Sequence, residues 1–509
     1  MVQSMTERTA ERVKPSYYLT SDGRVVAGTR RSRIAIILAV IALLVVVGVL
    51  GTAGGVALVL TTEARTPREW AAYLQQRNFG NATLEKLADR VADRLAAVDP
   101  LGSADGVLLP AIVGATEKRS GNSPAGHIRT VSTVDGLRDA VASALPNDVI
   151  LLGPGTYRIT GGAIQFTTIG NPNGPITVRA GRLGDAVIES DVVEAFNVSG
   201  PFWRFENLVM RGVCADHSQC EHAIHVVGAG TDVEIRNNRI ENFNAHLKIN
   251  GYRADWPDRG MIEGNTLLNT TPRMTRNPIT PIDLVAASDW VVRGNFIADF
   301  ARGVPGGATY GAFFKGAGEK NVFDRNVVLC AWKLHDATGP RVGVSLGGGG
   351  TDPSLRRDGG AIGMEQVGGV ISNNLIAFCS DSGIYLNRAA RSMVMHNTLL
   401  DTAGIDGRFL ETSGDITANI VDGAIRGRDG ASLNIWENDA PLLLGLFVGQ
   451  HPQRGYFRDP TRLDLAWTTP PTDLPPDPAD DGTDLCGQKR GVMTHPGAFD
   501  DYASCLARP

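Results

Sequence analysis

A short phrase centred on asparagine recurs along the middle of the chain and limits what it can fold into. It reads apolar, two residues, asparagine, one residue, apolar, as in Val292-Arg-Gly-Asn295-Phe-Ile297. The spacing between repeats falls as low as 22 residues and rises to 48, which is typical of solenoid coils whose loops differ in length. The repeated residues are Asn207, Asn238, Asn265, Asn295, Asn326, Asn374, Asn397 and Asn419.

A stretch of alternating apolar residues precedes the phrase in each coil, as in Leu247-Lys-Ile249 and Ile384-Tyr-Leu386. A period of two indicates strands with one face inward. We expect each asparagine to lie at a turn, in the left-handed conformation, and to bond to the asparagine one coil away. The 60 glycines in 509 residues fit many turns and exclude a helical bundle. The sequence therefore predicts an all-β chain, a right-handed parallel β-helix over residues 127–440.

Segments on both sides of the repeats are predicted to pack against the solenoid. Residues 134–145 form an amphipathic pattern that predicts a helix capping the open N-terminal end, where strand edges would otherwise be exposed. Residues 149–155 read as the first strand and its turn. Residues 441–509 are expected to be a tail that packs on the solenoid.

The N-terminal region predicts a membrane anchor. Residues 34–62 contain no charged residue, and Arg30, Arg31 and Arg33 precede them. Such a run is long enough to cross a bilayer, and the positive-inside rule places residues 1–33 in the cytoplasm. We expect a single-pass anchor at 34–60 and an extracytoplasmic β-helix domain; a cleaved signal peptide is the alternative. Residues 61–126 are expected to be a stalk, with one helix over 66–98 and a loose segment after it.

Six cysteines suit an oxidising compartment. Cys214 and Cys220 bracket a five-residue loop, and Cys486 and Cys505 lie in the tail, so both pairs are disulfide candidates. Cys330 and Cys379 occupy similar offsets in adjacent coils, as a disulfide or as two buried thiols. The sequence contains no CxxC motif, so the cysteines do not match a zinc site.

The segment Asp148–Tyr157, the asparagine coils and the ending Asp484–Arg490 with His495–Asp500 resemble bacterial secreted right-handed β-helix proteins. Many of these are grouped with the polysaccharide lyases of the chondroitinase B and alginate lyase type. The likeness covers about residues 128–505 and implies the fold. Those lyases carry a metal-binding pair of glutamates before an Asn-Lys-Ser stretch. No such pair lies beside Lys248 or Lys315, so their site is not transferred.

Aligning the strands on their apolar residues gives two outward columns. The inward residues used are Val226, Ile249, Leu284, Phe314, Met364, Leu386 and Leu410. The first column is His225, Lys248, Asp283, Phe313, Gly363, Tyr385 and Phe409. The second is Val227, Asn250, Val285, Lys315, Glu365, Asn387 and Glu411. The loop insertion at 327–360 is expected to form a wall or lid beside them.

This mixed polar face predicts a sugar cleft. The candidate catalytic residues are Lys248, Lys315, His225, Tyr385 and Arg388. The candidate substrate-binding residues are His246, Asn250, Asp283, Glu365 and Asn387. Structural interpretations stay open for all of them: Lys248 with Asp283 and Lys315 with Glu365 as ion pairs, the histidines as surface residues, and Tyr385 stacked on Phe409.

Three functions are compatible with this face. A polysaccharide lyase needs a base for the C5 proton and cations for the uronate carboxylate, which the lysines, His225, Tyr385 and Arg388 supply. A glycan-binding or cell-envelope structural module needs no catalytic group. A hydrolase is disfavoured because Asp283 and Glu365 would lie roughly 11–12 Å apart by strand spacing. The expected partners are an acidic polysaccharide and the membrane. The net charge of −5 argues against nucleic acid. Ca²⁺ is a candidate cofactor without a clear ligand set.

Overall fold

The computed structural model describes residues 17–19, 25–27, 65–76, 82–102, 106–117 and 126–506, the last with gaps at 336, 338, 362 and 476–478. The chain divides into two units, Met1–Glu63 and Ala64–Pro509. In the first, β1 (Tyr17–Leu19) and β2 (Val25–Ala27) pair antiparallel. The expected anchor at 34–60 lies outside the described residues. Among the helices that are described, none has the length and apolar character needed to cross a membrane.

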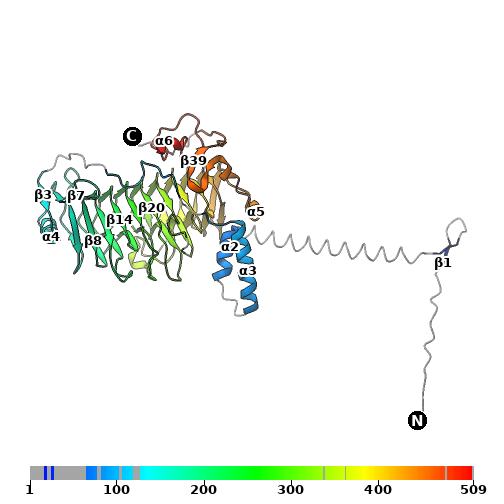
Figure 1. Cartoon of the computed structure of the whole chain (residues 1–509), viewed down its shortest axis with the longest axis horizontal. Helices are drawn as coiled ribbons and strands as arrows, with labels where there is room; N and C mark the ends of the chain where they lie inside the picture. The colour runs from blue at the N-terminus through cyan, green and yellow to red at the C-terminus, as the bar shows by residue number, and fades with distance from the viewer. Residues whose placement is uncertain are drawn as a thin grey trace, which may run out of the picture. The chain divides into compact units, whose positions relative to one another are not determined.

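The second unit contains a parallel β-helix, as predicted (Figure 1), and its strands form three long parallel sheets. The first sheet consists of β3 (Ile128–Val131), β4 (Val149–Leu152), β7 (Ile176–Ala180), β10 (Trp203–Glu206), β13 (Glu234–Arg236), β16 (Met261–Glu263), β19 (Val291–Arg293), β23 (Val322–Asp324), β27 (Val370–Ser372), β31 (Ser392–Met395), β34 (Ser413–Thr417) and β37 (Ser432–Trp436). The second consists of β5 (Gly155–Ile159), β8 (Ala186–Ser190), β11 (Val209–Gly212), β14 (Arg239–Glu241), β17 (Thr266–Leu268), β20 (Phe296–Ala298), β24 (Val327–Leu329), β28 (Leu375–Ala377), β32 (Thr398–Leu400) and β35 (Ile420–Val421). The third consists of β6 (Ile164–Phe166), β9 (Glu194–Val198), β12 (His222–Val227), β15 (Ala245–Asn250), β18 (Ile282–Val285), β21 (Thr309–Lys315), β25 (Arg341–Gly347), β29 (Ile384–Asn387), β33 (Gly404–Arg408) and β36 (Ala424–Arg428).

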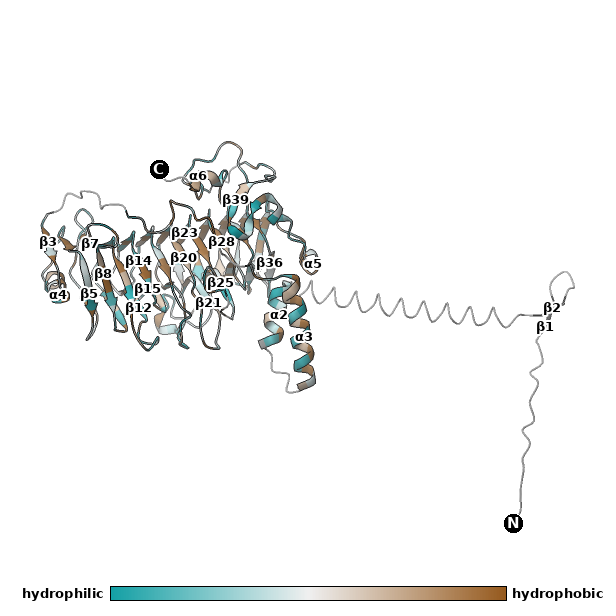
Figure 2. Ribbon diagram, in the orientation of Figure 1, coloured by the Kyte–Doolittle hydropathy of each residue, from teal (hydrophilic) through white to brown (hydrophobic). Residues whose placement is uncertain are grey.

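The remaining elements are short. A small sheet joins β22 (Gly318–Glu319), β26 (Gln366–Val367) and β30 (Ala389–Ala390). The C-terminal segment contains α5 (Leu443–Leu446), β38 (Phe457–Asp459), β39 (Asp464–Trp467) and α6 (Tyr502–Leu506), and 3₁₀ turns occur at Pro353–Leu355, Pro452–Tyr456 and Pro460–Arg462. Along some strands of the second sheet, such as β28, every residue is apolar, whereas along β15 apolar residues alternate with polar ones (Figure 2). The inward apolar side chains of the strands fill one continuous core inside the coil.

An asparagine ladder fixes the spacing of the coils at one corner. The Asn295 backbone N–H and its Nδ2 both donate to Asn326 Oδ1 at 2.9 Å, and Nδ2 also donates to Ile262 O at 2.9 Å. The ladder runs through Asn238, Asn265, Asn295, Asn326, Asn374, Asn397, Asn419 and Asn438. Each of these buried amides therefore satisfies backbone groups of the neighbouring coil.

Two details of the predicted ladder are wrong. Asn207 lies one position before it and accepts from Asn237 Nδ2 at 2.6 Å, while Leu208 N donates to Asn238 Oδ1. The left-handed residue is the one that precedes each ladder asparagine, such as Gly294 (φ 62°). The ladder side chain thus follows the bend instead of forming it, which explains why asparagine, glycine, arginine and histidine all occur at the bend itself.

Helix α4 (Val134–Ala142) covers the N-terminal end of the coil, as predicted (Figure 1). Thr133 caps it by accepting from Gly136 N at 3.1 Å. Leu137 and Val141 are buried in the core cluster that fills the solenoid. The helix therefore closes the apolar interior at its first turn.

The expected single helix over 66–98 is two helices, α2 (Pro67–Gln76) and α3 (Ala82–Val98), which pack against each other. Arg68 reaches from α2 to Asp401 Oδ1 at 2.6 Å and to the carbonyl of Cys379 at 3.1 Å. Both partners belong to the β-helix, and Arg68 is buried. This helical hairpin is therefore held against the coils, whereas the sequence indicated a free stalk.

The segment 106–117 and the C-terminal tail cover the outer face of the second sheet. Phe499 and Tyr502 from the tail are buried in a second apolar cluster with Phe296 and Leu329 of the sheet. Gly114 N donates to Gly294 O at 2.8 Å, so the segment expected to be loose lies along the coils. The disulfides Cys214–Cys220 and Cys486–Cys505 match the expected pairs, and Cys330 and Cys379, for which a disulfide or two buried thiols were open, also form a disulfide.

The predicted register fails in the 48-residue coil. Strand β25 carries Val344 and Leu346 inward, and Leu346 pairs with Phe314 and Leu386. The stretch around Met364 is a loop, so Gly363 and Glu365 leave the outward columns. This coil contains two segments with alternating apolar residues. Arg341–Gly347 is the one that forms the strand between β21 and β29.

The last assigned row is also shifted. Gly407 pairs with Leu386, while Leu410 is 81% exposed. Leu433 packs against Gly407 and fills the space that a larger inward side chain would occupy. Phe409 and Glu411 therefore do not belong to the columns either.

Candidate functional site

The outer face of the third sheet displays its polar residues in register. The strand pairings place His225 beside Lys248, Lys248 beside Asp283, and Asp283 beside Phe313. The same column continues through Ser345, Tyr385 and Asp406. Parallel strands are about 4.8 Å apart, so neighbours in the column are one strand spacing apart while Lys248 and Tyr385 are separated by four, about 19 Å.

A cluster of two histidines and one carboxylate lies on strands β9 and β12 of this face. Glu194 on β9 lies opposite His222 on β12, and His225 follows three residues later on the same strand. His225 Nδ1 is 2.8 Å from Glu194 Oε1, and its Nε2 is 2.7 Å from Asn250 Oδ1. All three side chains offer ligand atoms that lie within 4.8 Å of one another, and all are half-buried.

Electrostatics within the cluster are strong. Burial opposes ionisation of Glu194, but the hydrogen bond and charge of His225 outweigh it and lower the pKa of Glu194 to about 2. Burial, with the neighbouring positive charges of His225 and Lys248, lowers the pKa of His222 to about 4. Glu194 is thus a carboxylate and His222 a neutral imidazole at neutral pH.

Lys248, Asp283 and Lys315 continue the face. Lys248 Nζ donates to Asp283 Oδ2 at 2.5 Å, so the ion pair expected as the structural interpretation is present. Burial alone would raise the pKa of Asp283, yet Lys248 and Lys315 together hold it below its usual value. Lys315 Nζ lies 4.4 Å from the ring centre of Phe313. Within the described part of the chain Lys315 has no salt-bridge partner, unlike Lys248.

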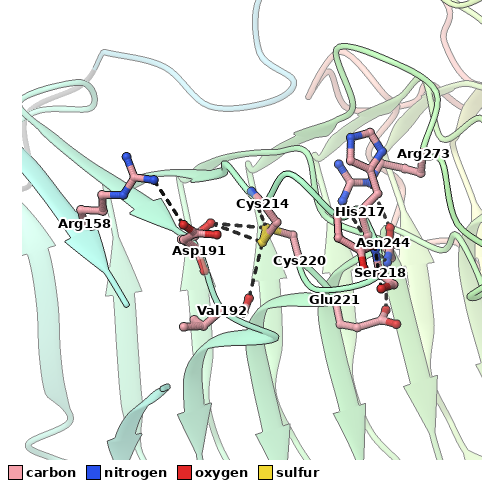
Figure 3. The surroundings of a disulfide bond; sticks show 12 residues. Arg158, Asp191, Val192, Cys214, His217, Ser218, Cys220, Glu221, Asn244 and Arg273 are labelled. Carbon is pink, nitrogen blue, oxygen red and sulfur yellow. Dashed lines mark hydrogen bonds and ion pairs between the residues drawn. A yellow bond between two sulfur atoms is a disulfide. The ribbon is translucent and has the colours of Figure 1, made fainter. Parts of the chain in front are cut away.

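The disulfide Cys214–Cys220 closes the loop that leads into His222 (Figure 3). Asn244 ties the far end of this loop to the sheet, because its Nδ2 donates to His217 O at 2.8 Å and to Glu221 Oε2 at 3.2 Å. Arg273 Nε donates to Asn244 Oδ1 at 2.9 Å. The start of β12, and with it the position of His222, is therefore fixed by covalent and polar contacts.

Tyr385 and Asn387 belong to a different cluster. Asn387 Nδ2 donates to the Tyr385 hydroxyl at 2.9 Å. Tyr385 lines a cavity of about 240 Å³ between the C-terminal coils and α2, whose other walls include Tyr310, Asp381 and Arg428. Burial and the charge of Asp406 raise the pKa of the Tyr385 hydroxyl. The structure therefore separates these two candidates from the two lysines.

Three further candidates are away from the open face. His246 is fully buried, with Nε2 3.0 Å from Leu268 O. Arg388 lies over the ring of Phe409, 4.8 Å from its centre. Glu365 is buried in the loop after β25, where it accepts from Gly316 N at 2.8 Å and pairs with Arg356. With Glu365 removed from the face, the carboxylate pair considered for a hydrolase is lost.

Sequence reasoning missed Glu194 and His222. The alignment selected outward residues at a period of two from His225, which skips His222, because Ala223 and Ile224 between the histidines are both buried. The available signal was His-x-x-His at the start of a strand, with a glutamate about one coil upstream.

No family model matches the chain. Pectate lyase L of Dickeya chrysanthemi is 33% identical over 144 residues, which is 23% of this chain and 34% of that protein; the enzyme of Dickeya dadantii (strain 3937) gives the same values. The chain thus spans about a third of the length of these relatives.

Among solved structures, pectate lyase Pel9A is 15% identical with a TM-score of 0.46, over 75% of this chain and 98% of that one. An alginate lyase from Paenibacillus sp. str. FPU-7 is 15% identical with a TM-score of 0.35, over 62% and 95%. The chain is a right-handed parallel β-helix protein that resembles polysaccharide lyases, with a partial sequence relationship to pectate lyase L.

Proposed function

We propose that the third sheet binds an acidic polysaccharide and cleaves it by β-elimination. The observation that carries the proposal is the placement of Lys248 and Lys315, both partly exposed, on the outer face of the third sheet on either side of buried Asp283. The partial relationship to pectate lyase L supports the same reaction class.

In this proposal Lys315, acting as the neutral amine, takes the C5 proton of a uronate. The C–H electrons form the C4–C5 double bond, the C4–O bond breaks, and water protonates the leaving sugar oxygen. Lys248 and His225 face the uronate carboxylate, whose charge must be neutralised for the proton to leave. Lys315 is assigned as the base because Lys248 is already held by Asp283. Glu365, once a candidate partner of Lys315, pairs with Arg356.

The test is a screen of polygalacturonate, alginate and glycosaminoglycans for the ultraviolet absorption of the unsaturated product. We expect Lys315→Met to abolish turnover while binding is kept, and Lys248→Met to weaken binding. The control is Lys320→Met, which removes an exposed lysine outside the third sheet. Cleavage that survives Lys315→Met would contradict the role of this residue, and no cleavage by the unaltered chain would contradict the lyase.

The second candidate function is a glycan-binding module. It is favoured by one observation: His225 and Lys248 are both engaged by partners within the protein, as residues of a rigid binding surface would be. Binding of an acidic polysaccharide by affinity electrophoresis, without any unsaturated product, would establish this function in place of the first.

We also propose that residues 34–60 anchor the chain in a membrane with the β-helix domain outside the cytoplasm. The uncharged run at 34–62 and three disulfides support this location. A C-terminal alkaline phosphatase fusion should be active and the protein should fractionate with membranes. A mature N-terminus mapped beyond residue 55 would contradict the anchor.

A further inference from the structure

We propose that Glu194, His222 and His225 form a site for a divalent transition-metal ion of the zinc class. Their ligand atoms lie within 4.8 Å of one another, and two ligands of one such ion lie at most about 4 Å apart. Small side-chain rotations therefore bring all three into the first coordination sphere. The three residues come from adjacent strands, β9 and β12, whose register is fixed by the sheet.

Apart from the contact between His225 Nδ1 and Glu194 Oε1, the hydrogen bonds around the cluster leave one ligand atom available on each side chain. His222 Nδ1 is 3.4 Å from the carbonyl of Ala245, which leaves Nε2. Glu194 Oε2 accepts from Asn197 Nδ2 at 3.0 Å, which leaves Oε1. Metal-binding histidines and carboxylates are usually oriented in this way, by a partner on the atom that does not bind the metal.

Asn250 sets the orientation of His225. Its Nδ2 donates to Gly251 O at 3.0 Å, so its Oδ1 is the atom that faces His225 and accepts from Nε2–H at 2.7 Å. His225 Nδ1 then faces Glu194 Oε1 at 2.8 Å. Two lone pairs at this distance require a positive species between them, either a proton or a metal ion. The metal would replace the proton that bridges the pair.

The donor set selects the class of metal. Two imidazole nitrogens and one carboxylate suit Zn²⁺, Co²⁺ or Ni²⁺, whereas Ca²⁺ takes six to eight oxygen ligands. Lys248, the nearest cation on the column, forms an ion pair with Asp283. The side chains of His225 and Glu194 are 14% and 25% exposed, so an ion bound here would keep open positions toward solvent. Metal binding of this kind does not depend on the proposed lyase activity.

The experiment titrates ZnCl₂, CoCl₂ and CaCl₂ separately into the full-length, chelator-treated chain without an affinity tag, at neutral pH. We expect one Zn²⁺ per chain by calorimetry, visible ligand-field absorption on adding Co²⁺, and much weaker Ca²⁺ binding. His222→Ala, His225→Ala and Glu194→Gln should each weaken Zn²⁺ binding at least about tenfold, and Asn250→Ala about tenfold through the lost orientation of His225.

His127→Ala is the matched control, because it removes an exposed histidine on the first-sheet side of the coil. Its affinity should equal that of the unaltered chain. Circular dichroism confirms folding, and His222→Gln replaces His222→Ala if the smaller residue disturbs the strand. Absence of Zn²⁺ binding would overturn the proposal, as would Zn²⁺ binding that persists unchanged in both histidine variants.

Discussion

Glu69 on α2 and Arg426 on β36 form a buried ion pair across 357 residues of sequence, with Arg426 Nη1 donating to Glu69 Oε2 at 2.6 Å. Their side chains are only 7% and 5% exposed. Asp406 accepts from Arg426 Nε at 3.1 Å on the other side of the guanidinium. The helical hairpin is thus held to the last coils of the solenoid by a largely buried charge network.

Replacing Glu69 by glutamine should therefore destabilise the protein. Loss of one partner from a buried ion pair typically costs 3–5 kcal/mol, and because Asp406 remains we expect about 3 kcal/mol. The measurement is the free energy of unfolding in urea. Asp89→Asn, on the exposed side of α3, is the control and should change stability by less than about 0.5 kcal/mol. Equal values for the two variants would show that the hairpin is not docked.

The asparagine ladder gives a second prediction. Asn326 accepts from Asn295 N and Nδ2 and donates to Asn374 Oδ1 at 3.1 Å, so Asn326→Ala leaves several buried groups without partners. We expect a loss of about 2–4 kcal/mol from these groups together. The same substitution at exposed Asn173 should be neutral in thermal unfolding. A neutral result at Asn326 would mean that water replaces the ladder at this corner.

A third prediction tests the register of the third sheet. Leu284→Asp buries a charge inside the coil and should prevent folding or cost several kcal/mol. Val285, which the sequence placed on the open face, is only 3% exposed, so Val285→Asp should also be severe. Val227→Asp, half-buried in the same outward column, should be mild. Soluble yield and urea midpoints distinguish the three; a severe Val227→Asp would contradict the register.

The fourth prediction concerns acid. Asp422 is buried, which by itself would raise its pKa, but hydrogen bonds from His451 and Arg454 lower the pKa to about 2. A carboxyl whose folded-state pKa is below its unfolded value stabilises the fold above the unfolded pKa of about 4. That contribution, about 2 kcal/mol, should be lost as the pH falls from about 4 to about 2. Asp422→Asn should reduce this part of the pH dependence of unfolding, and an unchanged slope would contradict the assignment.

The fold could be predicted because its main signals are local sequence patterns. Ladder asparagines and alternating strands recur, and where one alternating stretch exists per coil, as for Val226, Ile249 and Leu284, the register is correct. In the coil with two such stretches, nothing local distinguishes β25 from the segment around Met364. At Gly407 the inward space is filled by Leu433 from another sheet, which is a tertiary fact without a local signature.

The candidate site was predictable only in part. His225, Lys248 and Asp283 share a column that period-two alternation finds. His222 does not follow that period, and Glu194 lies opposite His222 on a strand of the preceding coil. The cluster can therefore be recognised only when the pairing of β9 with β12 is known. The docking of α2 beside Tyr385 joins positions more than 300 residues apart in sequence, which no repeat pattern encodes.

The asparagine corner also bears on how such a protein can change over generations. Because Asn326 and Asn374 still bond to each other across a 48-residue coil, and Asn397 to Asn419 across 22, the pitch at this corner does not depend on how long the other loops are. Insertions and deletions elsewhere in a coil therefore leave the strand pairing of its neighbours intact. A chain built this way can gain or lose whole surface loops, and with them new recognition surfaces, while its framework stays the same.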